Sequence, residues 1–270
     1  MPATETYGAQ PPIELLRLFI DKRGLYDRDE WVWKDVEDTT LIAAAAPPGG
    51  GRSPLTLRFT RHFNMFSLPS ADKTTLTKIF GSILQGFLKA GFNENVQKME
   101  DPIVTSTIEI YQRISEELRP TPAKFHYLFN LRDVSKVFQG ILMVKPVSVQ
   151  NPETMQRLWI NESLRVFYDR LINNQDKLWF TTLITELSLR NFRMQLDYEE
   201  TFVREKIMFG DLLKLDAPVK LYEEIRDKGK LIKVLSGMME EYNIGNTSKM
   251  NLVFFEDAVE HVLRIVRVLR

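Results

Sequence analysis

Three arginines stand where a side chain could act on a phosphate group. Arg58 and Arg61 follow a glycine-rich loop, and Arg132 lies at the expected start of an amphipathic helix. A guanidinium presents five N–H donors in one plane, a geometry that suits phosphate oxygens. The alternative for each is an ordinary surface or packing arginine paired with acidic side chains, and the residue types alone leave both interpretations open.

The glycine-rich loop is a second place to look for phosphate chemistry. A P-loop needs glycines followed by lysine and then serine or threonine, so that backbone N–H groups and the ammonium surround the phosphates. Gly49-Gly50-Gly51-Arg52-Ser53 lacks the lysine and the spacing. We interpret it as a tight, flexible connection in preference to a phosphate loop.

Other chemistries have little support. His62, His126 and His261 are far apart and form no ligand pair, so no metal site is predicted. The 270 residues include no cysteine, which excludes a disulfide framework and a thiol nucleophile. The 36 basic and 36 acidic side chains give zero net charge, which argues against nucleic acid as a partner. No apolar run approaches the roughly 20 residues of a membrane span, so no membrane partner is expected.

The elements before residue 69 mix two periodicities. Residues 13–22 have helical spacing of apolar side chains, and residues 54–62 are a short helix candidate with Ser53 as cap. The apolar run at 41–46 is typical of a buried strand, although its alanines would also suit a helix, and the alternating residues 64–68 are typical of a short strand. These patterns indicate part of an α/β unit.

After residue 69 the periodicity is almost wholly helical. Asn130 to Val144 is the clearest helix, with Asn130 as cap and Asp133 in the reciprocal position of a capping box. Further helices are expected over residues 70–90, 101–118, 152–172, 175–190, 229–242 and 254–269. The fold class predicted is therefore mainly α, an incomplete α/β part followed by a helical part.

Several segments together resemble the dynein heavy chain family. Residues 47–64, PPGGGRSPLTLRFTRHFN, are similar to the family's loop and short helix. Residues 120–142, PTPAKFHYLFNLRDVSKVFQGIL, resemble the helical lid of the third AAA+ module. Residues 2–17, 165–173, 207–213 and 250–267 also match, the last as the lead-in to the fourth module. The amino-acid sequence of these segments is most similar to that of axonemal inner-arm heavy chains.

The resemblance implies roles for the arginines. Arg132, in the family's N-L-R-D motif, would be sensor II, which binds the terminal phosphates of its own module's nucleotide. Arg61 would be the arginine finger for the nucleotide of the second module, with Arg58 as the alternative finger. Residues 1–69 would be the end of an AAA+ large subdomain, residues 70–245 the lid and residues 246–270 the lead-in to the next module.

Two departures limit what the resemblance implies. The strand before the glycine loop ends in Ala45-Ala46, where AAA+ modules often carry a polar sensor I residue, and Asn161-Glu162 replaces the usual His-Glu. The family's P-loop and Walker B acids do not occur in these residues. Phosphoryl transfer depends on both, so we expect no ATPase activity from this chain alone.

For the intact motor, the resemblance implies ATP or ADP with Mg²⁺ and ATP-driven, minus-end-directed movement. It implies neighbouring AAA+ modules, intermediate and light chains and microtubules as partners, and the ciliary axoneme as the location. The alternative is a non-catalytic, stand-alone helical interaction protein derived from a dynein gene.

Overall fold

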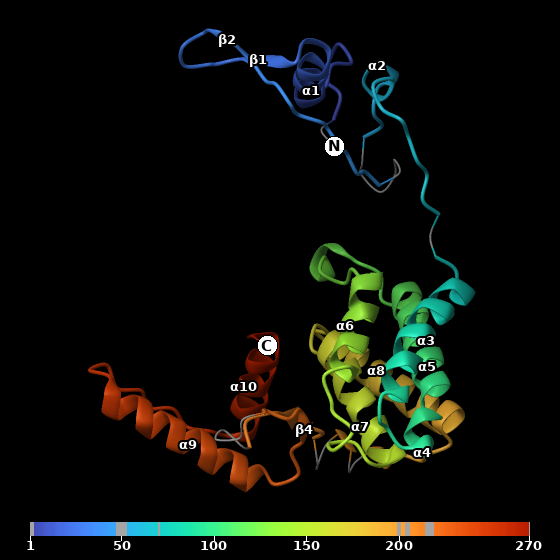
Figure 1. Ribbon diagram of the computed structural model, residues 1–270, viewed down its shortest axis with the longest axis vertical. Helices are drawn as coiled ribbons and strands as arrows, with labels where there is room; N and C mark the ends of the chain where they lie inside the picture. The colour runs from blue at the N-terminus through green and yellow to red at the C-terminus, as the bar shows by residue number, and fades with distance from the viewer. Residues whose placement is uncertain are drawn as a thin grey trace. The chain divides into compact units, whose positions relative to one another are not determined.

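The computed structural model describes residues 3–46, 53–69, 71–198, 201–202, 206–213 and 219–269. The described residues are mainly helical, with two short antiparallel strand pairs, which confirms the predicted fold class. The chain forms two compact units, Met1–Ser70 and Ala71–Arg270 (Figure 1). Residues 47–52, which include most of the glycine-rich loop, lie outside the described residues.

The N-terminal unit consists of a helix, a hairpin and a single helical turn. Helix α1 (Pro11–Lys22) carries two prolines in its first turn and ends at Arg23 in the left-handed conformation. Strands β1 (Gly24–Tyr26) and β2 (Trp33–Asp35) pair with Tyr26 opposite Trp33. Gly24 is required there, because a Cβ would come within 2.6 Å of the Trp33 ring.

Two strands expected in this unit are not formed, and one expected helix is shorter than predicted. The predicted helix at 54–62 is only α2 (Leu57–Thr60), and Thr56 precedes it in place of the predicted Ser53 cap. Residues 41–46 and 64–68 form no strand. Ile42 and Leu68, which lie in these segments, are 90% and 91% exposed. A strand needs a partner ladder, and the described residues supply none for these two segments. The hairpin over residues 24–35 was not predicted.

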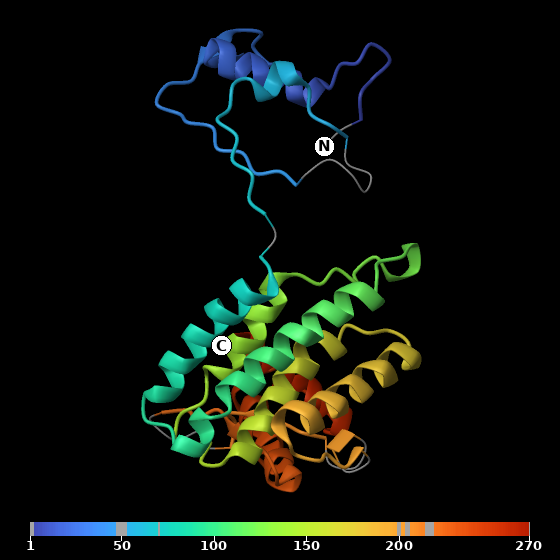
Figure 2. The ribbon, with the colours of Figure 1, turned by 90° about the vertical axis from the view of Figure 1, so that its right-hand side faces the viewer.

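The second unit is built on packed helices. Helices α3 (Lys73–Lys89) and α5 (Glu100–Glu117) pack along each other, with the short α4 (Glu94–Gln97) between them in sequence (Figure 2). Helix α6 (Leu131–Ile141) follows a short 3₁₀ turn at Pro122–Lys124. The Phe80 and Phe138 rings stack 4.6 Å apart and join α3 to α6.

Two of the predicted helices end in π-helical turns. Helix α7 (Pro152–Ser163) continues into the π segment Leu164–Tyr168, and α8 (Asn174–Leu187) continues into Ser188–Phe192. The core between these helices contains Trp159, which is fully buried and donates its indole N–H to Thr107 Oγ1 at 2.9 Å. The predicted ranges 152–172 and 175–190 were therefore close, but periodicity did not reveal the wider turns.

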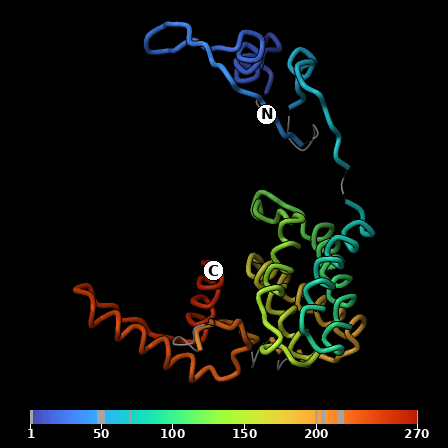
Figure 3. Tube along the Cα trace, in the orientation of Figure 1, coloured from blue at the N-terminus to red at the C-terminus, as the bar shows by residue number. Residues whose placement is uncertain are grey.

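The end of the chain forms a smaller cluster within the same unit. Strands β3 (Phe209–Gly210) and β4 (Glu223–Glu224) pair, and helices α9 (Lys228–Gly245) and α10 (Glu256–Leu269) follow (Figure 3). Leu231, Leu235, Val259 and Leu263 pack with Met208 and Ile225 in a second apolar cluster. Helix α10 thus packs over β3.

Candidate functional site

The start of α6 is fixed by a reciprocal set of hydrogen bonds. Asn130 Oδ1 accepts from the Arg132 N–H at 2.9 Å, and the Asn130 N–H donates to Asp133 Oδ2 at 3.1 Å. This is the capping box that the sequence predicted, and both halves of it are confirmed. The arrangement places Arg132 in the first turn of α6.

A second arginine fixes the capping carboxylate in turn. Arg170 Nη2 donates to Asp133 Oδ1 at 2.8 Å, and its Nη1 donates to Oδ2 at 3.3 Å. Arg170 also donates to the backbone oxygens of Leu128 and Val166, and its guanidinium lies 5.1 Å from the centre of the Phe129 ring. The start of α6 is therefore attached both to the loop before it and to the π segment after α7.

Arg132 itself is exposed, and its guanidinium makes no hydrogen bond or ion pair with the part of the chain that the structure describes. Its backbone is held, but its five donors remain available to an external acceptor. A fixed backbone together with guanidinium donors that have no acceptor among the described residues would allow this arginine to bind a phosphate group.

Arg58 and Arg61 belong to the other unit. Both are exposed, and they are three residues apart at α2, whose Phe59 is buried. Arg61 Nε lies 3.4 Å from His62 Nε2, and His62 lies 3.4 Å from an Asp21 carboxylate oxygen. Arg58 has no side-chain bond to the described residues. The structure thus places Arg58 and Arg61 at one short helical turn of the N-terminal unit, whereas Arg132 belongs to the second unit.

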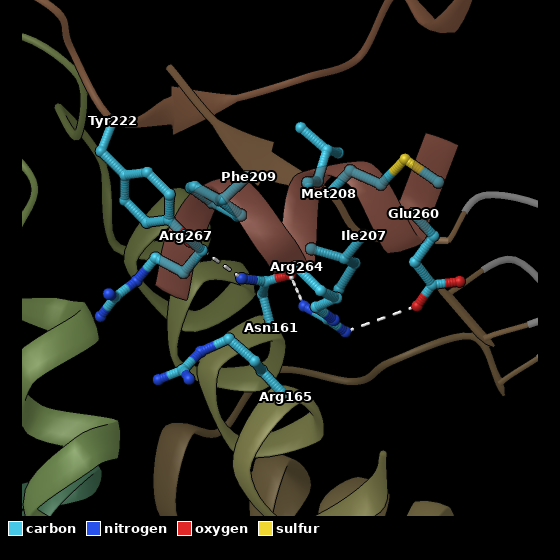
Figure 4. Close-up of a pocket in the computed structure, with 10 residues that line it drawn as sticks. Asn161, Arg165, Ile207, Met208, Phe209, Tyr222, Glu260, Arg264 and Arg267 are labelled. Carbon is cyan, nitrogen blue, oxygen red and sulfur yellow. Dashed lines mark hydrogen bonds and ion pairs between the residues drawn. The ribbon is translucent and has the colours of Figure 1, made fainter. Parts of the chain in front are cut away.

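The search from sequence missed a pocket in the second unit. It lies between the start of the π segment, β3, Tyr222 and α10 (Figure 4). Its lining residues are Asn161, Arg165, Ile207, Met208, Phe209, Tyr222, Glu260, Leu263, Arg264 and Arg267. Three arginines at one small pocket are unusual, because buried guanidinium groups need acceptors.

A buried carboxylate organises one side of this pocket. Glu162 is fully buried and accepts from the Tyr222 hydroxyl at 2.7 Å, from Asn161 Nδ2 at 3.2 Å and from Arg165 Nε at 2.9 Å. Burial and the adjacent Glu162 carboxylate raise the pKa of Tyr222 far above its ordinary value. Tyr222 therefore stays a hydrogen-bond donor at neutral pH.

Helix α10 contributes the other side. Arg264 Nε lies 2.8 Å from Asp169 Oδ2, and its Nη1 donates to Asn161 Oδ1 at 3.3 Å. Arg267 is only 8% exposed, and its Nε and Nη2 have no hydrogen-bond partner among the described residues. One signal in the sequence could have revealed that Arg267 is buried. Val259, Leu263 and Arg267 recur every four residues, which places an arginine on the apolar face of α10.

The comparisons with known proteins find two family models that match parts of the chain. A family model described as the P-loop containing dynein motor region matches residues 1–71, and an AAA+ lid domain model matches residues 103–203. Over these residues the chain carries AAA+ sequence of the dynein type. The lid model contains Arg132, the capping box and Arg170, and the motor-region model contains Arg58 and Arg61.

The relatives of this dynein-type chain are large proteins. It is 46% identical over its whole length to dynein axonemal heavy chain 6 of Homo sapiens, and 43% identical to heavy chain 1 of Mus musculus. Heavy chain 3 of Mus musculus is 40% identical, again over the whole chain. The chain spans 6% of the length of the first of these relatives and 7% of the other two. Axonemal dyneins are ciliary, cytoskeletal proteins, as expected from the resemblance.

Two further findings concern metals and membranes. Within the described ranges, no three histidine, cysteine or acidic side chains gather as metal ligands. His126 instead contacts the Arg170 carbonyl oxygen at 3.0 Å, and His261 is exposed on α10. Among the helices that the structure describes, none has the length and apolar character that crossing a bilayer requires.

Proposed function

We propose that this dynein-type chain is the lid and part of the large subdomain of the third AAA+ module of an inner-arm axonemal heavy chain. In this proposal residues 1–69 belong to the large subdomain, residues 70–245 are the lid, and residues 246–270 lead into the fourth module. The neighbouring AAA+ modules are its direct partners. The intact heavy chain would act with intermediate and light chains to move along microtubules toward their minus ends.

The observation that carries the proposal is the unpaired Arg132 guanidinium on a fixed helix start. In the intact motor, we propose that it acts as sensor II and donates to the terminal phosphate oxygens of a bound ATP. Hydrolysis removes the group that accepts these charge-assisted bonds, so the lid would be held differently over ATP and ADP. The lid would then pass the nucleotide state on as rigid movement.

Arg61 is proposed as the finger that reaches the nucleotide of the second module, with Arg58 as the alternative. Both are exposed, as a residue that acts on a neighbouring module must be. A finger stabilises the charge that develops on the transferring phosphoryl group. ATP or ADP with Mg²⁺ would be bound in the intact motor, with the P-loop and the metal-binding acid supplied by other parts of the heavy chain.

The alternative function, a stand-alone helical interaction protein, rests on the exposed apolar side chains of the N-terminal unit. Ile42, Phe66 and Leu68 are 88–91% exposed. In the motor these residues would be covered by other parts of the AAA+ ring, whereas in the alternative a separate protein would cover them. The exposure supports both, and we favour the motor because the Arg132 guanidinium has no partner among the described residues.

A labelling experiment in the intact heavy chain tests the proposal. These 270 residues contain no cysteine, so Ser135→Cys introduces the one thiol within them, on the exposed face of α6 near Arg132. We expect bound nucleotide to slow alkylation of this thiol, read by mass spectrometry of its peptide. Thr182→Cys, exposed on α8, is the matched control and should react at one rate throughout. Equal rates for Ser135→Cys with and without nucleotide would contradict the proposal.

A further inference from the structure

Arg267 is a buried charge without an acceptor in the described part of the chain. Its Nε and Nη2 donors are bound to nothing, although only 8% of the residue is exposed. The centre of the Tyr222 ring lies 6.0 Å from the guanidinium carbon, at the outer limit of a cation–π contact. A ring face does not satisfy two in-plane N–H donors, so these donors need an acceptor that the described residues do not provide.

The other arginines of the pocket are already neutralised. Arg165 pairs with Glu162 at 2.9 Å and Arg264 pairs with Asp169 at 2.8 Å. Glu260, which also lines the pocket, lies 3.3 Å from Lys206 and 3.4 Å from Arg264. Among the described residues that line the pocket, Arg267 is the arginine with no carboxylate within ion-pair distance, so a bound anion would supply the counter-ion that it lacks.

The size of the pocket limits what could bring that charge. Only about 10 Å³ of it is accessible to the centre of a water-sized particle, so it takes one small particle. A tetrahedral phosphate or a carboxylate would have to displace side chains that are held by several hydrogen bonds. In Figure 4 the guanidinium groups of Arg165 and Arg267 point to the same side of the pocket, and that of Arg264 turns toward Glu260.

We propose that this pocket binds one compact monovalent anion, of which chloride is the common example, on the free donors of Arg267. The anion would satisfy donors on the apolar face of α10 where that face meets Tyr222. It would thereby hold α10 against the π segment that carries Arg165. The inference is independent of the role proposed for Arg132.

Chloride binding to the full 270-residue chain tests the proposal. The linewidth of the ³⁵Cl resonance increases when chloride exchanges with an asymmetric protein site. We expect the wild-type chain to broaden the signal saturably, at constant ionic strength set with gluconate. Arg267→Met keeps much of the side-chain volume and removes the donors, and it should weaken chloride binding at least tenfold. Arg119→Met, at an exposed arginine, should leave the broadening unchanged.

Two additions keep the test decisive. If Arg267→Met does not fold, Arg267→Lys keeps the charge but removes the planar donors, and it should still bind chloride more weakly than wild type. Bromide should compete with chloride at similar concentration, and sulfate should not, because the pocket is too small. Broadening that is the same in wild type and in the folded Arg267 variant would overturn the proposal. So would the absence of saturable broadening in wild type, or displacement of chloride by equimolar sulfate.

Discussion

Asp133 and Arg170 form a two-pronged ion pair, with Nη2–Oδ1 at 2.8 Å and Nη1–Oδ2 at 3.3 Å. The same carboxylate accepts from the Asn130 backbone N–H, so one buried side chain joins the start of α6 to the segment after α7. The pair has a structural consequence for Arg132, because the direction of the first turn of α6 depends on it.

Replacing Asp133 with alanine should therefore be costly. The change removes the reciprocal half of the capping box and leaves the Arg170 guanidinium without its carboxylate. We expect a loss of about 3 kcal/mol in the free energy of unfolding. Lys136→Ala is the control, since Lys136 is exposed and 3.7 Å from the same carboxylate, and it should change stability by less than about 0.5 kcal/mol. Urea unfolding followed by circular dichroism measures both, and similar values for the two variants would contradict this account.

A second prediction concerns Gly140 in α6. A Cβ at this position would overlap the Glu162 carboxylate and come within 2.6 Å of its Cγ. Glu162 is fixed by Arg165 and Tyr222, so it cannot move aside without losing these bonds. Gly140→Ala should cost about 2 kcal/mol or more in spite of the better helix propensity of alanine.

The matched control is Gly86→Ala in α3, where an added Cβ meets nothing within 4 Å. That substitution should stabilise the chain by about 0.5–1 kcal/mol, because glycine is a poor residue for a helix interior. Both unfolding free energies come from the same urea titration. A stabilising effect at Gly140 as well would show that Glu162 is not held as the structure places it.

The cap of α3 should make part of the stability depend on pH. Asp72 accepts hydrogen bonds from the Thr74 hydroxyl and the Thr75 backbone N–H, which lower its pKa from 3.8 to about 2. Because the folded-state pKa is depressed, this contribution is complete above the unfolded value near 3.8 and is lost as pH falls toward 2.

Asp72→Asn is the informative variant, since it keeps an acceptor oxygen but does not titrate. The melting temperature of the wild type should exceed that of the variant at pH 5, and the difference should shrink steadily between pH 4 and pH 2.5. A difference that stays constant over this range would show that the Asp72 cap does not titrate as expected.

The parts that could be predicted from sequence are those that local rules determine. The capping box at Asn130 and Asp133 and the apolar stripe of α6 involve neighbouring residues only, and the structure has both. The strand expected at 41–46 was wrong, because a strand requires partner strands distant in sequence. The π segment at 164–168 was missed for a different reason, since helical periodicity does not distinguish a wider turn.

The candidate sites divide in the same way. The exposure of Arg132 follows from its place off the stripe of α6, which the sequence shows. The pocket at Arg267 joins residues about 100 positions apart, Asn161 and Arg264 among them, and no local pattern predicts that contact. The arginine on the apolar face of α10 was nevertheless visible in the sequence.

Isothermal titration of the 270-residue chain with Mg·ATP addresses the prediction that it has no ATPase activity alone. The printed sequence contains no P-loop motif, so the phosphates would lack their cradle of backbone N–H groups and their lysine. We expect no binding in the micromolar range and no phosphate release. Tight binding of Mg·ATP would contradict the prediction, whatever the role of Arg132 in the intact motor.

The central claim is that Arg132 reads the terminal phosphate of ATP from a fixed lid helix. It is tested most directly by measuring ATP and ADP affinities of this AAA+ module in the intact heavy chain, for wild type and for Arg132→Ala. Lys136→Ala, one turn further along α6, controls for loss of a nearby positive charge. We predict that Arg132→Ala reduces the preference for ATP over ADP by about tenfold to a hundredfold, the value of charged hydrogen bonds worth about 1.5–3 kcal/mol. An unchanged ATP:ADP preference in a folded Arg132→Ala motor would contradict the account.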